Sequence, residues 1–128
     1  MVGLLIVSHS TRLADGVKEF VDQVAHGINV VAAGGRDDGG LGTSVERIRE
    51  GLRTVESPGG TLVLVDIGGA VLSVETAIEA LGKTDVLISD APLVEGAYLA
   101  ALEAAAGSTL HETAAAALQA RAMVKVHE

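Results

Sequence analysis

The 128-residue sequence contains no cysteine, and Phe20 and Tyr98 are its only aromatic residues. The missing cysteines exclude disulfide bonds, thiolate nucleophiles and cysteine-based zinc sites. Two rings are too few for a base-stacking platform or an aromatic cage around a sugar or a quaternary ammonium group. Stability must therefore come from aliphatic packing. The length predicts a single domain over residues 1–128, since it is too short for two ordinary domains.

Positive charge is scarce, because the sequence has 9 Lys and Arg residues and 17 Asp and Glu residues, which gives a net charge of −8. This balance argues against binding to nucleic acid or to anionic membranes. No apolar run is long enough for a membrane span, and the alanine-rich segment 93–106 carries Glu95 and Glu103. The first residues lack the basic start and cleavage site of a signal peptide. We therefore expect a cytoplasmic protein.

Two apolar patterns alternate along the chain. Short runs rich in β-branched residues predict four buried strands, at Val2–Val7, Ile28–Ala33, Thr61–Val65 and Asp85–Ile88. Apolar residues at helical spacing predict five amphipathic helices, around residues 13–24, 45–55, 74–81, 94–102 and 110–118. Strands joined by helical crossovers form a parallel sheet with helices on both faces. The sequence thus predicts an α/β three-layer sandwich with a mainly parallel four-stranded sheet of order 2-1-3-4.

Several local signals refine this prediction. Ser10 or Thr11 is suited to cap the first helix, and Thr43 with Glu46 has the spacing of a capping box before the second. Residues 121–128 leave two alternatives open, a last strand or a frayed tail.

The predicted strand order places a functional crevice outside the carboxyl ends of the first and third strands. Ser8 and His9 follow the first strand, and Asp66 follows the third. Neighbouring parallel strands lie about 4.8 Å apart, so we expect His9 and Asp66 to touch. A carboxylate that holds one imidazole nitrogen protonated leaves the other nitrogen as an oriented acceptor or nucleophile. Ser10 and Thr11 would place helix N–H groups, which favour anions, at the same edge.

Glycine-rich loops supply further candidates for contact with phosphate or a partner. These candidates are Gly39, Gly40, Gly42 and Thr43 after the second strand, and Gly68 and Gly69 after the third. Glycine lets a backbone approach a ligand closely, and Arg36 offers a cation nearby. The loops match neither a Walker motif nor the GxGxxG fingerprint, so no bound nucleotide is implied.

Each candidate also has a purely structural interpretation. His9 could satisfy a backbone carbonyl, Asp66 could serve as an acid at a helix N-terminus, and the glycine-rich loop could be a plain turn. The remaining histidines, at positions 26, 111 and 127, have no partner at metal-ligand spacing. We therefore predict no metal site.

Four segments in the same order carry a family resemblance: LLIVSHSTRLADGV, then AAGG with GLGTS, then LVLVDIGGAVLSVETAIEAL, and finally APLVEGAYLAAL. Together they resemble the phosphotransferase subunit of phosphoenolpyruvate-dependent dihydroxyacetone kinases, which belongs to the mannose-type IIA fold. The resemblance spans nearly the whole chain. Gly69 stands where some members have a serine, which leaves a hydroxyl contact to phosphate open.

The resemblance implies a phosphoryl relay. In that family the histidine of the VSHS segment, here His9, accepts phosphate from the carrier protein HPr. The phosphate then passes to ADP held in the nucleotide-binding subunit of the kinase, and the resulting ATP phosphorylates dihydroxyacetone on a third subunit. This chain would carry no cofactor, because ADP and magnesium belong to the partner subunit. Family members form homodimers, so a homodimer is expected here too.

Two other functions compete with the relay. Small tetrapyrrole chelatases carry a strand-end histidine in a segment similar to VSHSTR, but they need further metal-facing residues, for which His111 is the one candidate. A regulatory module phosphorylated on His9 would share the chemistry without onward transfer.

Overall fold

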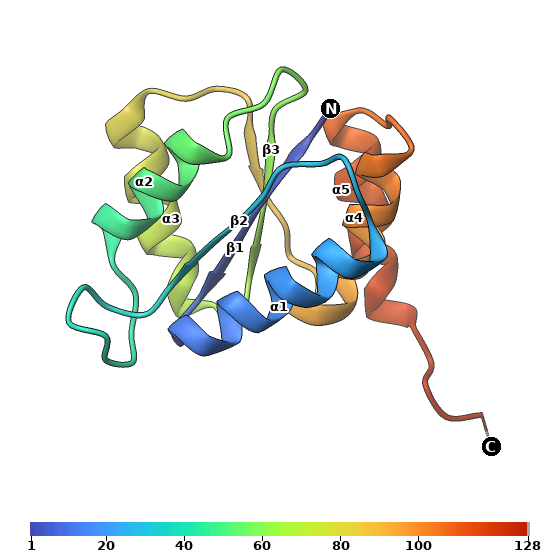
Figure 1. Ribbon diagram of the computed structural model, residues 1–128, viewed down its shortest axis with the longest axis horizontal. Coiled ribbons are helices and arrows are strands. Elements are labelled where there is room, and N and C mark those ends of the chain that lie inside the picture. The colour runs from blue at the N-terminus through green and yellow to red at the C-terminus, as the bar shows by residue number, and fades with distance from the viewer. Residues whose placement is uncertain (128) are drawn as a thin grey trace.

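The structure, a computed structural model, describes residues 1–127. Strands and helices alternate along the chain until two consecutive helices and a short 3₁₀ helix close it (Figure 1). The elements are β1 (Gly3–Ser8), α1 (Thr11–Val24), β2 (Val30–Gly34), α2 (Val45–Thr54), β3 (Thr61–Val65), α3 (Gly69–Leu81), β4 (Val86–Ile88), α4 (Leu93–Ala105), α5 (Leu110–Leu118) and the 3₁₀ helix η1 (Gln119–Ala122).

The four strands form one parallel sheet in the order β2-β1-β3-β4. Helices α2 and α3 cover one face of this sheet, and α1, α4 and α5 cover the other (Figure 1). The predicted sandwich and strand order are confirmed. Because β1 and β3 are central, their residues are buried on both faces, which explains the unbroken apolar runs in their sequences.

Successive side chains of β1 point into two separate cores. Leu4 and Ile6 pack towards α1 and α4, whereas Leu5 and Val7 pack towards α2 and α3. The α4 side is built mainly from alanines, at positions 91, 97, 100, 101, 104 and 117. Small side chains let helices approach the sheet and one another closely. The carboxyl ends of β1 and β3 are thus held between two packed layers.

The helix ends differ in part from the sequence signals. Ser10 caps α1, with its hydroxyl accepting a hydrogen bond from the Leu13 N–H. The capping box predicted at Thr43 and Glu46 is wrong, because α2 begins one residue later than that spacing requires and Ser44 is its cap. Thr43 is thereby free to make the different contact described below.

The buried face of α1 is narrower than its apolar spacing predicts. Ala14, Val17 and Val21 are buried, whereas Leu13 and Phe20 are each 43% exposed. The Phe20 ring stacks on Tyr98 of α4, with 6.0 Å between ring centroids. The two aromatic residues therefore join α1 to α4 at the surface.

The end of the chain is helical before it becomes irregular. Arg121 and Ala122 belong to η1, and residues 123–127 form no strand. The last-strand alternative is therefore wrong for these residues, and Glu128 lies outside the described residues. Among residues 1–127, every helix is too short or too polar to cross a membrane.

Candidate functional site

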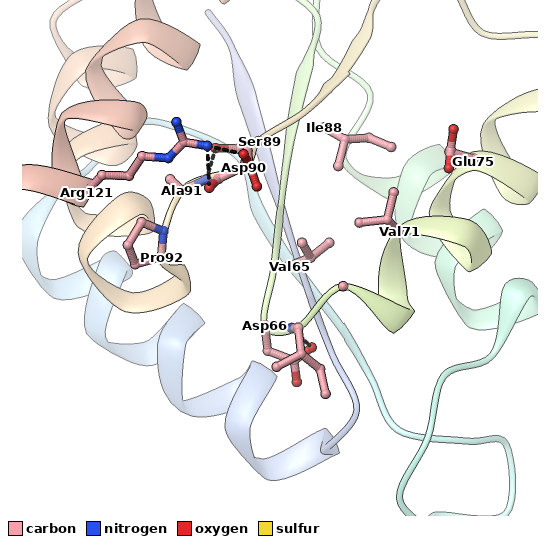
Figure 2. A pocket seen from close by; sticks show the side chains of 12 residues that line it. Val65, Asp66, Val71, Glu75, Ile88, Ser89, Asp90, Ala91, Pro92 and Arg121 are labelled. Atoms are coloured by element: carbon pink, nitrogen blue, oxygen red, sulfur yellow. Dashed lines mark hydrogen bonds and ion pairs between the residues drawn. The ribbon is translucent and has the colours of Figure 1, made fainter.

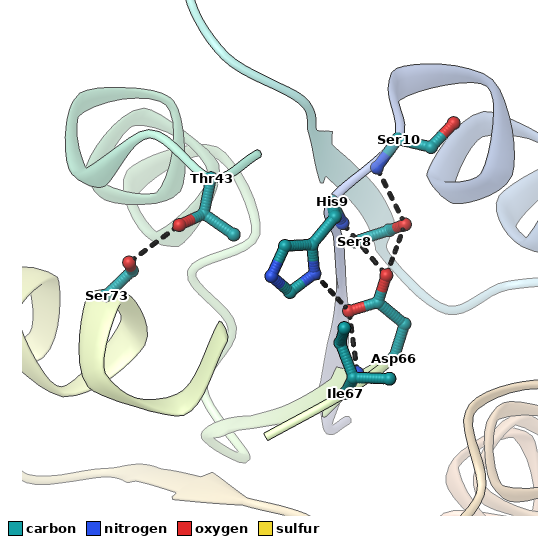
Figure 3. A network of polar contacts seen from close by, with 7 residues as sticks. All are labelled: Ser8, His9, Ser10, Thr43, Asp66, Ile67 and Ser73. Atoms are coloured by element: carbon teal, nitrogen blue, oxygen red, sulfur yellow. Dashed lines mark hydrogen bonds and ion pairs between the residues drawn. The ribbon is translucent and has the colours of Figure 1, made fainter. Parts of the chain in front are cut away.

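His9 and Asp66 meet at the carboxyl edge of the sheet. Pairing of Val7 with Val65 brings the ends of β1 and β3 together, and the chain then turns into α1 and α3. The Nδ1 atom of His9 lies 2.9 Å from the Oδ1 atom of Asp66 (Figure 3). The contact expected from the sequence is confirmed, because the first and third strands are neighbours in the sheet.

Asp66 is the centre of a polar network. Its Oδ2 accepts hydrogen bonds from the Ser8 hydroxyl at 2.8 Å and the His9 N–H at 2.9 Å. Its Oδ1 accepts from the Ile67 N–H at 2.7 Å as well as facing the His9 ring. The Ser8 hydroxyl in turn accepts from the Ser10 N–H at 3.0 Å. The carboxylate is thereby held in one orientation (Figure 3).

These contacts set the charge of Asp66. Burial is the largest single influence and would raise the pKa of this carboxyl. Hydrogen bonds from the His9 N–H, the His9 ring, the Ser8 hydroxyl and the Ile67 N–H together outweigh burial and hold the pKa below its ordinary value. Asp66 is therefore an ionised acceptor at neutral pH.

The ionised carboxylate determines which nitrogen of His9 is available. A carboxylate without a proton can only accept, so Nδ1 carries the hydrogen and Nε2 of the neutral ring carries the lone pair. Nε2 faces the start of α3, since a Cβ added at Gly69 would lie 3.4 Å from it. The imidazole side chain is 29% exposed. The geometry thus presents Nε2 as a nucleophile that another molecule can reach.

The first turn of α3 lies beside this nitrogen. Gly68 caps the helix and Gly69 begins it, and within residues 1–127 their N–H groups donate no hydrogen bond. The N-terminus of a helix favours negative charge through its free N–H groups and its dipole. Gly68 and Gly69 therefore lie at the end of β3, as the sequence predicted, and Gly69 is beside Nε2 of His9.

The predicted loop residues separate into two groups. The Gly42 N–H donates to the His9 carbonyl at 2.8 Å, with a φ of 136° that favours glycine. The N–H groups of Gly39 and Gly40 donate within their own turn, to the Arg36 carbonyl and the Asp38 carboxylate. Thus Gly42 contacts the histidine segment directly, and the other two shape the loop.

Two hydroxyl groups also belong to this region. The Thr43 and Ser73 hydroxyls lie 2.8 Å apart, and in Figure 3 this pair is on the opposite side of the imidazole from Asp66. The Thr11 hydroxyl instead donates to the Gly34 carbonyl at 3.0 Å and joins the start of α1 to the end of β2.

Sequence reasoning did not assign a role to Ser8 or Ser73. Ser8 is fully buried, and its hydroxyl donates a hydrogen bond to Asp66. The one sequence feature that could have indicated this role is a hydroxyl side chain at the end of an apolar run. Ser73 had no signal, because it meets Thr43 across the fold.

A hollow of about 610 Å³ lies beside this network, between the ends of β3 and β4 and the start of α3. Figure 2 shows Asp66 at one end of it and the Arg121–Asp90 ion pair at the other. His9 does not line it. Among residues 1–127, no three His, Cys, Asp or Glu side chains are grouped as metal ligands would be.

A family model described as "PTS system fructose IIA component" and designated EIIA-man matches residues 3–115. The chain belongs to the EIIA-man family. This confirms the mannose-type IIA resemblance, and the matched range contains the whole His9–Asp66 network.

Several curated proteins similar to this chain are named as DhaM subunits of dihydroxyacetone kinases. A Listeria innocua protein called PEP-dependent dihydroxyacetone kinase 2, phosphoryl donor subunit DhaM, is 39% identical over 80% of this chain and 86% of its own length. A Lactococcus lactis phosphotransferase subunit DhaM is 36% identical over 84% and 85%. The Escherichia coli phosphoryl donor subunit is 38% identical, but this chain spans a quarter of it.

Solved structures agree with the EIIA-man fold. The crystal structure of a protein of unknown function is 34% identical, covers 92% of this chain and 93% of its own, and has a TM-score of 0.82. A phosphotransferase system component EIIA from Streptococcus agalactiae is 22% identical over 98% and 97%, with a TM-score of 0.71. The latter supports the fold alone.

Proposed function

We propose that this chain is a phosphoryl carrier that accepts phosphate from phospho-HPr on Nε2 of His9 and passes it to ADP bound in the nucleotide-binding subunit of dihydroxyacetone kinase. The observation that carries the proposal is the contact between the ionised Asp66 carboxylate and Nδ1 of His9. This contact keeps the hydrogen on Nδ1 and leaves the Nε2 lone pair directed outwards. Relatives named as phosphoryl donor subunits of dihydroxyacetone kinase support the choice of system.

Two displacements at phosphorus make up the relay. The Nε2 lone pair attacks the phosphorus on the donor histidine, and the breaking N–P bond returns its electron pair to the donor ring. An oxygen of the terminal phosphate of ADP then attacks the same phosphorus, and the Nε2–P bond returns its pair to His9. The hydrogen on Nδ1 stays in place throughout, so His9 leaves the cycle as it entered.

Asp66 acts on the intermediate between these steps. With hydrogen on Nδ1 and phosphorus on Nε2, the ring is cationic, and the carboxylate 2.9 Å away stabilises that charge. The free N–H groups of Gly68 and Gly69 provide donors for the phosphoryl oxygens. Positioning and charge stabilisation are the main requirements of phosphoryl transfer.

The openness of the site fits alternating partners. A His9 side chain that is 29% exposed at the end of a strand is accessible to another protein's phosphohistidine and then to a bound nucleotide. ADP and magnesium would arrive on the kinase subunit, so this chain needs no cofactor site of its own. The expected homodimer stays a prediction that sedimentation of the purified chain tests.

Intact-mass spectrometry tests the proposal. The wild-type chain and His9→Ala are incubated with phosphoenolpyruvate, enzyme I and HPr, and the ADP-loaded kinase subunit is then added. We expect one phosphoryl group on the wild type alone, and its loss when the kinase subunit is added. Circular dichroism should show an intact fold in His9→Ala, since a partly exposed side chain at a strand end contributes little to the core.

The alternatives predict other outcomes. A phosphoryl group that persists in the presence of the kinase subunit would favour the regulatory module. No phosphoryl group, together with cobalt or nickel binding that depends on His9, would favour the chelatase. Membership of the EIIA-man family favours the relay over the chelatase, and relatives named as phosphoryl donor subunits favour it over the regulatory module.

A further inference from the structure

A pair of hydroxyl groups faces the reactive edge of His9. The Thr43 and Ser73 hydroxyls lie 2.8 Å apart and come from two segments, the loop before α2 and the second turn of α3. In Figure 3 the ring nitrogen of His9 that is turned away from Asp66 points towards this pair. That nitrogen is Nε2, so the hydroxyl groups lie on the side where a phosphoryl group would be attached.

Ser73 does not use its hydroxyl as the other residues within helices of this chain do. The hydroxyls of Thr54, Thr76 and Thr113 each donate to the carbonyl four residues earlier in the same helix. Such a bond is a common one for a serine or threonine inside a helix. The Ser73 hydroxyl instead points across the fold to Thr43, and among the described residues neither of these two hydroxyls has another hydrogen-bond partner.

Two features hold the pair close to His9. The Gly42 N–H donates to the His9 carbonyl at 2.8 Å, and Thr43 is the next residue of that loop. On α3, Ser73 lies four residues after Gly69, and residues at this spacing share one helix face, with about 5–6 Å between their Cβ positions. A Cβ at Gly69 would lie 3.4 Å from Nε2, so Ser73 lies one turn further along the face that meets the imidazole.

The pair is suited to bind the oxygens of a phosphoryl group. Two hydroxyl groups carry two hydrogens, and the bond between them uses one, so the other hydrogen is free for an incoming acceptor. Both residues are half-buried, and neither hydroxyl is hydrogen-bonded to Nε2. Rotation about the Cα–Cβ bond also allows each hydroxyl to leave its partner and donate to an oxygen instead.

We propose that the Thr43 and Ser73 hydroxyls bind the phosphoryl oxygens carried on Nε2 of His9. The inference rests on the proposed function and adds two side chains to the groups that touch the reacting atoms. Both hydroxyls keep their hydrogens, because they donate to oxygen and transfer no proton. They act together with the free N–H groups at the start of α3, so donors reach the phosphoryl oxygens from two segments of the chain.

Donors that belong to this chain can serve both transfer steps. A transferring phosphoryl group spreads its negative charge over three oxygens, and hydrogen-bond donors stabilise this charge. The donor histidine and the bound ADP approach the phosphorus from outside, one after the other. Contacts made by Thr43 and Ser73 therefore persist through both displacements.

The test removes the hydroxyl groups and keeps the side chains similar in size. Thr43→Val with Ser73→Ala is compared with wild type and with Thr43→Ser, which keeps the hydroxyl. Thr76→Val is the matched control, because the Thr76 hydroxyl also lies on α3 but donates to the Leu72 carbonyl of its own helix. Rapid-quench measurement gives the single-turnover rates of transfer from phospho-HPr to His9 and from phospho-His9 to the ADP-loaded kinase subunit.

We expect the double variant to slow both steps about 10²-fold, the effect of removing donors from a developing charge. Thr43→Ser should retain most of the rate, and Thr76→Val should match wild type. Urea unfolding followed by circular dichroism should show that the double variant is folded under the assay conditions, since it loses one half-buried hydrogen bond.

A phosphorus NMR titration separates a contact with the phosphoryl group from a purely structural role. The chain is phosphorylated with phosphoramidate, which loses ammonia as the Nε2–P bond forms, and His9→Ala identifies the signal of phospho-His9. Hydroxyl donors favour the dianionic phosphoryl group over the monoanion, so the double variant should raise the pKa of this group above that of wild type. Loss of a structural hydrogen bond alone would leave this pKa unchanged.

Two results would overturn the proposal. Transfer rates in the double variant equal to those of wild type would show that the hydroxyls do not stabilise the phosphoryl group. Slow transfer with an unchanged pKa of the phosphoryl group would reduce the pair to a structural contact between α3 and the loop before α2. The proposed function fails separately, if the wild type takes no phosphate from phospho-HPr. The titration of the chain phosphorylated with phosphoramidate then still decides whether the hydroxyls bind phosphoryl oxygens.

Discussion

Two pairs of side chains, each containing a carboxylate, lie at the same edge of the sheet, and their surroundings differ. The His9 and Asp66 side chains are 29% and 13% exposed, whereas those of Arg121 and Asp90 are 53% and 87% exposed. Asp66 accepts three further hydrogen bonds, while the Asp90 carboxylate is contacted by Arg121 alone among residues 1–127. The carboxylate of Asp66 is therefore held inside the fold, whereas the carboxylate of Asp90 makes its contact on the surface.

The strands explain this difference. Asp66 follows β3, a central strand buried on both faces, and His9 follows the adjacent central strand β1. Asp90 follows β4, a half-buried edge strand of three residues. Packing on both faces of a central strand restrains the groups at its end, and a misplacement of about 1 Å can cost a reaction about 10²-fold. The hollow of about 610 Å³ has Asp66, Asp90 and Arg121 in its lining but not His9, so the hollow does not by itself locate the candidate nucleophile.

The largest effect that separates the two pairs should come from equal substitutions of the two carboxylates. Asp66→Asn should slow phosphoryl transfer through His9 by about 10²-fold or more, because an amide neither holds Nδ1–H as strongly nor balances the cationic ring. Asp90→Asn, which removes the same charge, should stay within about twofold of wild type. Rapid-quench measurement of single-turnover transfer checks both. Equal rates in the two variants would contradict the role given to Asp66.

A smaller effect concerns the pH dependence of stability. The pKa of Asp66 is lower in the folded chain, so the unfolded chain binds its proton more readily. Its contribution to the free energy of unfolding is therefore complete above the unfolded pKa of about 3.9 and is lost as pH falls through the lower folded value. Urea unfolding between neutral pH and the acid limit should show a steeper loss for wild type than for Asp66→Asn. Parallel curves would show that the carboxylate is not stabilised by folding.

The smallest effect is expected at the exposed pair. Arg121→Gln should change the free energy of unfolding by about 0.5 kcal/mol or less, since solvent screens two side chains this accessible. Denaturant unfolding at low and high salt measures the change. A loss well above 1 kcal/mol would show instead that the pair anchors η1 to the end of β4 and that the contrast between the two pairs is weaker than their exposure indicates.

The sequence was enough to predict the pairing of His9 with Asp66 because parallel neighbours end at one edge and the alternation of elements favours one strand order. The sequence was not enough to predict the contacts of Ser8 and Ser73, since a single hydroxyl side chain belongs to no periodic pattern that would indicate its partner. It predicted a capping box at Thr43 because Glu46 follows three residues later. In the structure α2 begins one residue later, so Ser44 caps the helix and the Thr43 hydroxyl contacts Ser73 instead.

The sequence by itself determined the alternation of elements and thereby predicted the layers and the strand order, and it marked His9 as the candidate reactive side chain, because periodicity defines the elements and polar residues stand at the strand ends. Only the tertiary structure decided which nitrogen of His9 is free, since that depends on the Asp66 carboxylate arriving from 57 residues away. It also decided that the hydroxyls of Thr43 and Ser73, 30 residues apart in the chain, meet on the side of the imidazole away from Asp66. Hydrogen bonds and ion pairs act over a few ångströms, and only folding brings such distant segments that close.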